Sequence, residues 1–501
     1  MGSTFGTYNI AYTGMYVSQA SMTATSTSLA NINTTGASKV QVSNEETNSV
    51  SSDGTVRGTG VNVQSILRSR DIYLDSNYRT QNVQAVYYSV KSGNLEYLDK
   101  LLSEYEVSST DSSDSSSSSD DDTGLEQAIQ NFFSAWETLS TDVTTESSRE
   151  AVISAATDFI SMLSEIDSQL QQLQADAVTG VKDGVDSLND YASQVAQLNL
   201  KISQAEANGG EASYLRDQRD ALLDQMSSLA DITVTETNGV LKVSIGGVPL
   251  VKGGETHALV VEGTGTTDDP LTVKWADFDS TAKIKSGSIA AYLEDADQTA
   301  YTSISASELP YNFTTSSGSS SISTLRQGLN NLITTLANQV NALCTSGYDL
   351  NGNAGVAFFT ALDANQPLSI SNIQVNPELV ADSDKLAASS SQETGDNTLA
   401  LAVCKLASDA TCYKSGGLSL NITDYYKSII SWLGTAGETA SANYTTQAAL
   451  ATQLDTQRQS VYSISIDEEV SNLIQFQNAY AASARVMSTI DNLLGDLIDA
   501  V

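Results

Sequence analysis

The segment YDLNGNAG, at 348–355, contains the residues best spaced to bind a metal ion. Asp349, Asn351 and Asn353 recur at every second position with Gly352 among them, as at the start of a calcium-binding loop. Such a loop needs a bidentate acid at its twelfth position, and that position is Thr360. The ligand set is incomplete, so we interpret this segment as a turn.

Residues for nucleophilic or zinc chemistry are scarce. His257 is the only histidine, which nearly excludes a zinc-protease helix or a Ser-His-Asp triad. The cysteines, Cys344, Cys404 and Cys412, are too few for a disulfide framework. Cys404 and Cys412 are close enough in sequence for one disulfide, but three buried or half-buried thiols are the simpler interpretation. We therefore expect no catalytic residues, no metal and no cofactor.

Acidic side chains cluster without needing a catalytic role. Asp467, Glu468 and Glu469 lie in the first turn of a predicted helix, where carboxylates favour the positive end of the helix dipole. Ser465 and Glu468 have the spacing of a capping box. In LRDQRDALLDQ, at 215–225, acids and arginines alternate at spacings that predict ion pairs along one helix.

Composition excludes some partners. The chain has 501 residues and a formal charge of −36, so nucleic acid and anionic membranes would repel it. It contains no run of 18 apolar residues, which argues against a transmembrane helix. The first residues lack the basic flank and apolar core of a secretory signal peptide, since Lys39 is the first charged residue. Taken alone, these observations favour a cytoplasmic protein, and they leave open an export route that cleaves no signal.

The two ends of the chain carry helical patterns that need partners. Between residues 8 and 32, small or weakly apolar side chains recur at alternating spacings of three and four, the coiled-coil period. Such a helix is marginal on its own in water. Residues 463–501 form a stronger amphipathic pattern, with a second apolar stripe beside the first. That wide face favours burial either within the chain's own domain or against neighbouring subunits.

The interior alternates long helices with one β region. Helices are predicted over 82–106, 145–207, 213–230, 287–305, 322–345, 395–408 and 422–460. A stutter near Gly180 and Gly184 predicts a local weakness in the longest helix. Strands are predicted over 231–275, with Asn238-Gly239 as a hairpin turn. The Ser/Asp-rich run at 108–123 has nothing to bury and is predicted to be a disordered loop.

The ends resemble a known class. SLANINTTG, at 28–36, is similar to the Asn-rich segment that ends the first helix of flagellar axial proteins, the rod, hook and hook-associated proteins. IDEEVSNLIQFQNAYAASARVMSTIDNLLGDLI, from 466 onward, resembles their closing helix. Interior segments, including YLRDQRDALLDQMSSLADITVTETNGVLKVSIGGVPLV at 214–251, resemble the hook-associated protein 1 family. The chain departs from the family pattern at Ala37-Ser38-Lys39.

The resemblance implies an elongated, mainly α fold with a small β insertion. Its terminal helices would pair as a coiled coil in a domain of residues 1–60 plus 461–501. A helical bundle of 61–230 plus 287–460 and a β-hairpin domain of 231–286 would follow. We expect the terminal segments to fold on assembly and to form the subunit interface. The residues predicted at that interface are Leu29, Asn31, Ile32, Asn33, Gly36, Leu473, Ile474, Phe476, Tyr480, Met487 and Leu494.

The function implied by the resemblance is structural. The protein would form a ring at the extracellular junction between flagellar hook and filament. Its partners would be copies of itself, hook protein, the second hook-associated junction protein and an export chaperone on the C-terminal helix. It would leave the cell through the flagellar type III channel. The alternative is a sibling axial protein, such as hook protein, the second junction protein or a flagellin-like filament protein.

Overall fold

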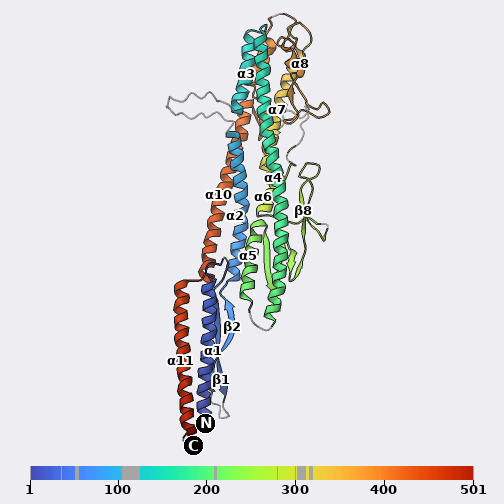
Figure 1. The fold of residues 1–501 in the computed structure, drawn as a ribbon. Coiled ribbons are helices and arrows are strands. Elements are labelled where there is room, and N and C mark those ends of the chain that lie inside the picture. Colours follow the sequence, from blue (N-terminus) through green and yellow to red (C-terminus); the bar gives the residue numbers. More distant parts are fainter. Residues whose placement is uncertain are drawn as a thin grey trace, which may run out of the picture.

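The computed structural model describes residues 2–34, 36–50, 56–103, 124–207, 211–237, 239–278, 280–299, 301, 312–314, 320–393 and 395–499. They form an elongated, mainly helical molecule with small sheets, as predicted, and both termini lie at one end (Figure 1). None of the described helices is long and apolar enough to span a membrane.

Four elements make up the end that holds the termini, which we call the terminal unit. Helices α1 (Gly2–Ala30) and α11 (Ile466–Asp499) pack side by side and run in opposite directions (Figure 1). Strands β1 (Val40–Val50) and β2 (Val56–Arg68) form an antiparallel hairpin that also packs on α1. Helix α1 thus lies between α11 and the hairpin (Figure 1).

Long helices carry the fold away from the terminal unit. Helices α2 (Ile72–Ser103) and α10 (Ile422–Tyr462) lie along each other (Figure 1). Beside them α4 (Glu146–Glu206) is one continuous helix of 61 residues. Helix α3 (Leu125–Thr141) packs on the first part of α4, and α5 (Ser213–Leu229) packs on the last part. Their shared apolar faces form the two hydrophobic cores of the molecule.

The β insertion covers the second half of α4. Its main sheet is antiparallel, in the order β3 (Ile232–Thr237), β4 (Val240–Ile245), β5 (Val248–Lys252) and β6 (Glu255–Thr256). A second pair joins β7 (Leu259–Glu262) to β8 (Thr272–Trp275). Alternate apolar side chains of β4, and the consecutive Leu250 and Val251 of β5, are buried with α4 residues such as Val185 and Leu188. The predicted strand region is therefore confirmed, although Asn238 of the predicted turn lies outside the described residues.

The far end of the molecule is built around α7 (Ser321–Ser346), whose first four turns are buried on nearly all sides. The short elements around it are β9 (Asn312–Phe313), β10 (Phe359–Thr360), β11 (Gln374–Val375), α8 (Pro377–Ala381), a 3-10 turn (Ser383–Lys385), α9 (Thr398–Leu406), β12 (Tyr413–Ser415) and β13 (Leu418–Leu420). Strands β13, β12 and β9 form one sheet, and β10 pairs with β11.

Two predicted helix boundaries were wrong. Helix α2 begins at Ile72 rather than near residue 82. Helix α6 (Ser288–Ala296) ends before Asp297, although a helix was predicted to 305. The Asp297 carboxylate accepts the Thr299 N–H over 2.9 Å and its hydroxyl over 3.0 Å, an Asx turn that competes with further helix. The Ser/Asp-rich run at 108–123 lies outside the described residues, and the predicted domain boundaries stay a prediction.

The expected weakness in α4 is absent, because the helix runs unbroken through Gly180 and Gly184. A Cβ at Gly180 would lie 2.9 Å from the Tyr292 ring, and one at Gly184 would lie 2.8 Å from Ile289. Both neighbours belong to α6. The glycines therefore allow two helices to approach closely, and the packing stabilises α4 where its sequence alone would not.

Candidate assembly interface

The pairing of α1 with α11 uses mostly small side chains. Ala11, Ser18 and Thr25, all from the predicted α1 pattern, are buried. A Cβ at Gly14 would lie only 3.2 Å from the Ser483 hydroxyl, so the two helices approach closely there. Small side chains bury little apolar area, and this pairing contributes less hydrophobic free energy than a leucine-rich seam would.

The predicted interface residues of α11 fall into two groups. Leu473, Phe476, Tyr480, Met487 and Leu494 are half-buried along the side that faces α1. Ile474 instead points outward and is 53% exposed. The other exposed large apolar side chains of α11 are Ile466, Val470, Val486, Leu493 and Ile498.

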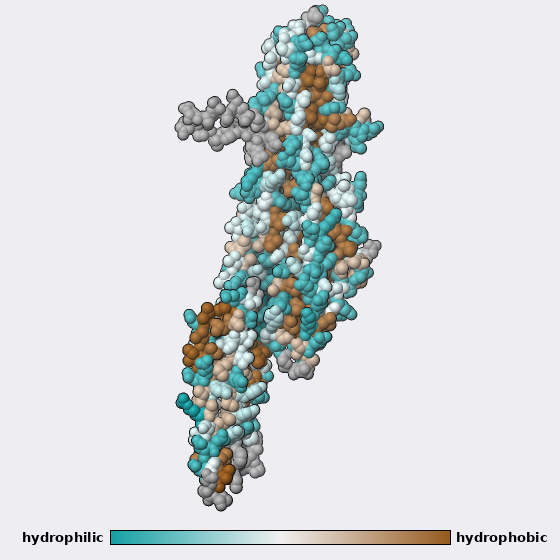
Figure 2. All heavy atoms as spheres, in the orientation of Figure 1, coloured by the Kyte–Doolittle hydropathy of each residue, from teal (hydrophilic) through white to brown (hydrophobic). Residues whose placement is uncertain are grey.

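Three of these side chains, Ile466, Val470 and Ile474, recur at every fourth position and form an exposed apolar strip on the first turns of α11. Apolar residues gather over the upper part of α11, beside the end of α10 (Figure 2). A solvent-exposed apolar surface of this kind is typical of a site that another protein covers. The assembly role of the predicted residues, in both helices, stays a prediction.

The turn after α1 is closed by local hydrogen bonds. The Asn31 side-chain amide donates to the Thr27 carbonyl over 3.0 Å, and the Thr34 hydroxyl donates to Asn31 Oδ1 over 3.4 Å. Gly36 has φ of 83°, the left-handed conformation that favours glycine. Leu29 and Ile32 are half-buried, while Asn33 is exposed.

The residues that depart from the family pattern attach the terminal unit to the rest of the molecule. The Ser38 N–H and hydroxyl donate to the two carboxylate oxygens of Asp217 on α5, over 2.9 and 2.7 Å. The Lys39 N–H donates to the Tyr462 carbonyl over 2.9 Å, and the Lys39 ammonium pairs with Glu468. Glu468 was expected to close a capping box with Ser465; its carboxylate instead joins the two terminal segments.

Next to this attachment lies a cluster of buried charges that was not predicted from the sequence. Arg68 Nη1 contacts Asp217 at 3.1 Å and Asp220 at 2.5 Å. On the other side, Arg458 Nη1 contacts Asp224 at 2.5 Å. Burial raises the pKa of the Asp220 carboxyl, but the surrounding arginines outweigh it and the net shift is downward. The cluster joins β2, α2, α5 and α10, so it holds the terminal unit against the helical part.

The prediction that acids and arginines of 215–225 pair with each other was therefore wrong, because their partners lie in other elements. Asp217, Asp220 and Asp224 bind arginines of other elements rather than of α5 itself. Arg216 pairs with Glu206 and Glu236, at 2.7 and 3.1 Å. Spacings along one helix cannot distinguish these cases, because the partners lie far away in sequence. The signal available in the sequence was the unusual density of arginine and aspartate near 68–79 and 215–225.

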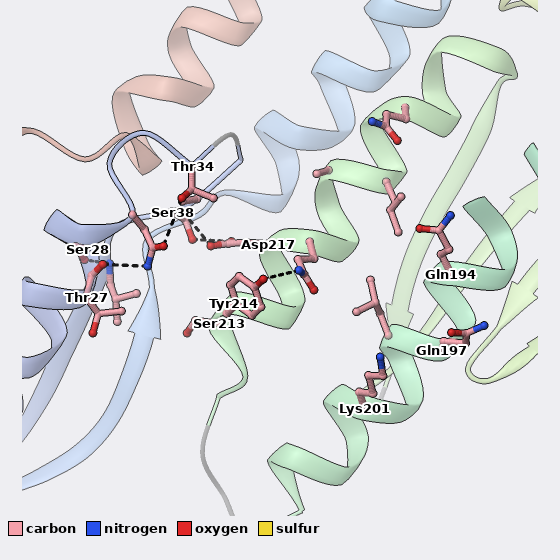
Figure 3. A pocket seen from close by; sticks show the side chains of 18 residues that line it. Thr27, Ser28, Thr34, Ser38, Gln194, Gln197, Lys201, Ser213, Tyr214 and Asp217 are labelled. Atoms are coloured by element: carbon pink, nitrogen blue, oxygen red, sulfur yellow. Dashed lines mark hydrogen bonds between the residues drawn. The ribbon is translucent and has the colours of Figure 1, made fainter. Parts of the chain in front are cut away.

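A cleft of about 500 Å³, lined by both polar and apolar side chains, separates the turn after α1 from α4 and α5 (Figure 3). Thr27, Ser28 and Thr34 line one side, and Gln194 and Lys201 line the other (Figure 3). The Gln218 amide in its wall donates to the Tyr214 hydroxyl over 2.7 Å. Its polar groups are neutral amides and hydroxyls apart from Lys201 and Asp217, and the rest of its lining is apolar, as at Leu198 and Leu222, so the cleft offers no arrangement for acid–base or nucleophilic chemistry.

The candidate metal and catalytic residues have structural partners. Asp349 Oδ1 accepts the N–H groups of Asn351 and Asn353 over 2.8 Å each, which confirms the turn. His257 lies between β6 and β7 rather than in a strand, and its Nδ1 is 2.8 Å from Asp277. The three cysteines are free. In the described part of the chain, no group of His, Cys, Asp and Glu side chains could hold a metal ion.

Comparison with known proteins connects this architecture to the flagellum. Residues 113–359 match the model of the flagellar hook-associated protein FlgK helical domain. Residues 462–500, which contain α11, match the model of the flagellar basal body rod FlgEFG protein C-terminal region. The second match shows that α11 is similar in sequence to the C-terminal region of those rod proteins.

Relatives match over the whole length. Flagellar hook-associated protein 1 of Bacillus subtilis is 27% identical over 100% of this chain and 99% of its own. Flagellar hook-associated protein 1 of Escherichia coli is 23% identical over 98% of this chain and 99% of its own. The structure of the flagellar hook junction protein FlgK from Burkholderia pseudomallei covers 78% of this chain and 100% of its own, with a TM-score of 0.59 and 16% identity. That structure supports the fold described above.

Proposed function

Because this chain belongs to the flagellar hook-associated protein 1 family, we propose that it is a structural subunit of the junction between flagellar hook and filament, assembled through its terminal unit. The observation that carries the proposal is the outer surface of α11, which is apolar although α11 already has a partner in α1. When a helix is paired on one side and apolar on the other, its exposed apolar side is expected to bind another protein surface.

Assembly would bury this surface against other subunits. Burying a large apolar side chain contributes about 1.5–3 kcal/mol, so several such residues would hold a subunit firmly in a tube wall. The neighbours would be further copies in a ring, hook protein on one side and the second hook-associated junction protein on the other. The charge cluster at Arg68 and Arg458 would transmit load from this wall to the helical part.

Export also follows from the proposal. The chain would pass the flagellar type III channel without a cleaved signal peptide, and it would act outside the cell. Before assembly an export chaperone would cover the apolar side of α11. A cover is needed because residues such as Ile474 and Leu493, 53% and 57% exposed, would otherwise favour aggregation.

The sibling roles of hook protein, second junction protein or filament protein are less well supported. The relatives named above are hook-associated protein 1 and match nearly the whole chain, including the interior that differs among axial proteins. The match of α11 to rod proteins explains why the terminal helices alone do not separate these roles.

A truncation and a point variant test the proposal. A chain that lacks 470–501 should remain folded and soluble but should not join hook to filament. Ile474→Asp should leave thermal unfolding nearly unchanged, because its side chain is 53% exposed, and should reduce incorporation into isolated hooks. Leu418→Asp on β13, at a side chain 69% exposed far from the terminal unit, is the control. Normal assembly of the truncated chain would overturn the proposal.

A further inference from the structure

We propose that neighbouring copies meet by placing α11 of one subunit against the β1–β2 hairpin of the next, with Arg485 level with the edge of the hairpin that carries Glu45 and Glu46. This inference rests on the proposed function, since it assumes that copies stand side by side in a ring. A closed ring needs a heterologous contact, in which two different surfaces of the subunit meet. Because α1 lies between them, α11 and the hairpin present two such surfaces (Figure 1).

Both surfaces carry exposed charged side chains. Glu45, Glu46 and Arg57 are exposed on the hairpin, and Arg485 and Asp496 are exposed on α11. Within the described residues, none of these five side chains forms an ion pair. The net charge of −36 makes exposed cations rare, so an arginine in the middle of α11 calls for an acidic neighbour.

Hydrogen bonds between the hairpin and α1 fix the position of the hairpin along the helix axis. The Val61 N–H donates to the Thr13 hydroxyl over 3.3 Å, and Glu46 stands opposite Val61 in the strand register. Glu46 is therefore level with Thr13. At the other end of the hairpin, the Val40 N–H donates to the Ser28 hydroxyl over 3.2 Å. These two hydrogen bonds fix the position of the hairpin along the α1 axis. The position of a hairpin residue along this axis can therefore be compared with that of a residue in α11.

The close contact between Gly14 and Ser483 sets the height of α11. Arg485 lies two residues beyond Ser483, about 3 Å along the helix axis. Gly14 is one residue from Thr13, so Arg485 and Glu46 are level to within about 5 Å, less than one helical turn. In copies that stand side by side, the two opposite charges would face each other.

A second pair of opposite charges also lies at matching positions along the axis, with the arginine, Arg57, on the hairpin and the acid, Asp496, on α11. Arg57 precedes Val61 by about 13 Å of strand, and Asp496 follows Ser483 by about 20 Å of helix. Their heights also agree to within about one helical turn. Arg485 and Asp496 both lie about 200–220° around the helix from Ser483, on the side turned away from α1. Towards the end that holds the termini, the charge on the hairpin changes from acidic at Glu46 to basic at Arg57. In the same direction, the charge on α11 changes from basic at Arg485 to acidic at Asp496.

Apolar side chains surround the charges on both surfaces. Val486 and Leu493 on α11 are 43% and 57% exposed, and Val56 and Ile66 on the hairpin are 61% and 41% exposed. Burial of these groups would supply most of the affinity. The charge pairs would fix the register and the direction of the contact, which is the usual contribution of complementary charge at an interface.

Charge exchange tests the contact. The variants are Arg485→Glu alone, Glu45→Lys with Glu46→Lys, and all three together, each expressed as the full chain in flagellated cells. We expect each partial variant to lower the amount of chain in isolated hooks about fivefold, and the combined variant to restore it to within about twofold. A combined variant no better than the worse partial one would overturn the contact. Purified monomers should unfold alike, because these side chains are exposed.

Cross-linking tests the geometry separately. Two forms of the chain, one with Glu46→Cys and one with Arg485→Cys, are co-expressed with Cys404→Ser, because Cys404 is the native cysteine that is not buried. A short bis-maleimide should link them as dimers in assembled hooks. Gln41→Cys, about 17 Å from Glu46 along the same strand, is the control and should not link. Hooks that contain the chain but give no dimer would overturn this contact alone. Absence of the unaltered chain from hooks would overturn the proposed function.

Discussion

The Lys39 ammonium group pairs with the Glu468 carboxylate, 429 positions away in the sequence. The Lys39 side chain is 11% exposed and the Glu468 side chain 55% exposed. Next to them the Lys39 N–H donates to the Tyr462 carbonyl over 2.9 Å. Two segments from opposite ends of the chain therefore meet where the terminal unit joins the helical part, and Lys39 binds both the backbone and the side chain of the other segment.

Reversing this pair should weaken the attachment of α11. Lys39→Glu would place a third carboxylate beside Glu468 and Glu469, and Glu469 is only 1% exposed. We expect a loss of about 1–2 kcal/mol in the stability of the terminal unit, measured by urea unfolding. Adding Glu468→Lys should restore at least half of that loss. If the double variant were as unstable as Lys39→Glu, the ion pair would not be the reason for the loss.

Gly184→Ala should destabilise the protein even though alanine favours helix. The new Cβ would lie 2.8 Å from Cγ1 of Ile289, whose side chain is fully buried. Overpacking of this kind costs about 1–3 kcal/mol, which outweighs the gain of about 1 kcal/mol in helix propensity.

Gly93→Ala is the matched control, because Gly93 is also helical and nothing lies within 4 Å of its added Cβ. We expect Gly93→Ala to raise the melting temperature and Gly184→Ala to lower it. Equal effects of the two substitutions would show that the close packing of α6 on α4 does not depend on glycine at position 184.

The long helices and the β insertion could be predicted from sequence, because each has a regular period. The pattern over 145–207 matches α4 almost to the residue, and the alternation at 231–275 matches the sheet. The terminal helices were predicted for the same reason. A glycine at position 36 allows positive φ after the first helix, and Gly36 has φ of 83°.

The hairpin of β1 and β2 was not predicted, because its alternation is hidden. β1 reads VQVSNEETNSV, largely polar, and register shifts after Ser43 and after Thr47 change which residues face α1. The attachment site was missed for a different reason. Its partners, such as Arg458 and Asp224, come from elements far apart in sequence, and only the three-dimensional fold brings them within 2.5 Å.

Stability should depend on pH through Asp295, a buried residue of α6. Burial is the largest cause that raises its pKa, to about 7, while the Asn94 amide, which donates over 2.6 Å, opposes the shift. Because the pKa of Asp295 in the folded state lies above its ordinary value of 3.8, the folded state holds the proton more tightly. Stability should therefore fall as pH rises from about 4 to 7 and stay lower above pH 7.

Asp295→Asn should remove this dependence. At pH 8 the variant should be more stable than the parent by about 2–4 kcal/mol, and at pH 4 the two should be nearly equal. The control is Glu294→Gln, since the Glu294 carboxylate pairs with Lys91 at 2.6 Å and its loss should destabilise at pH 8. Unfolding curves of the three proteins from pH 4 to 8 measure both effects. A constant difference between Asp295→Asn and the parent across this range would contradict the assignment.

The terminal helices should be the least stable part of the isolated subunit. Helix α1 has no charged residue, and its seam with α11 buries small side chains such as Ala11 and Ser18. Several of its hydroxyls bond back to carbonyls one turn earlier, including Thr23 to Gln19 over 3.0 Å and Thr27 to Thr23 over 2.9 Å, which slightly weakens a helix.

We therefore expect amides of residues 1–40 and 470–501 to exchange hydrogen much faster than those of α4 in the monomer, and to become protected in assembled hooks. Helix α4 is the internal reference, because its apolar side is buried along its whole length. Protection of α1 equal to that of α4 in the monomer would mean that the α1–α11 pair is stable by itself. Assembly would then dock a preformed unit rather than complete its folding.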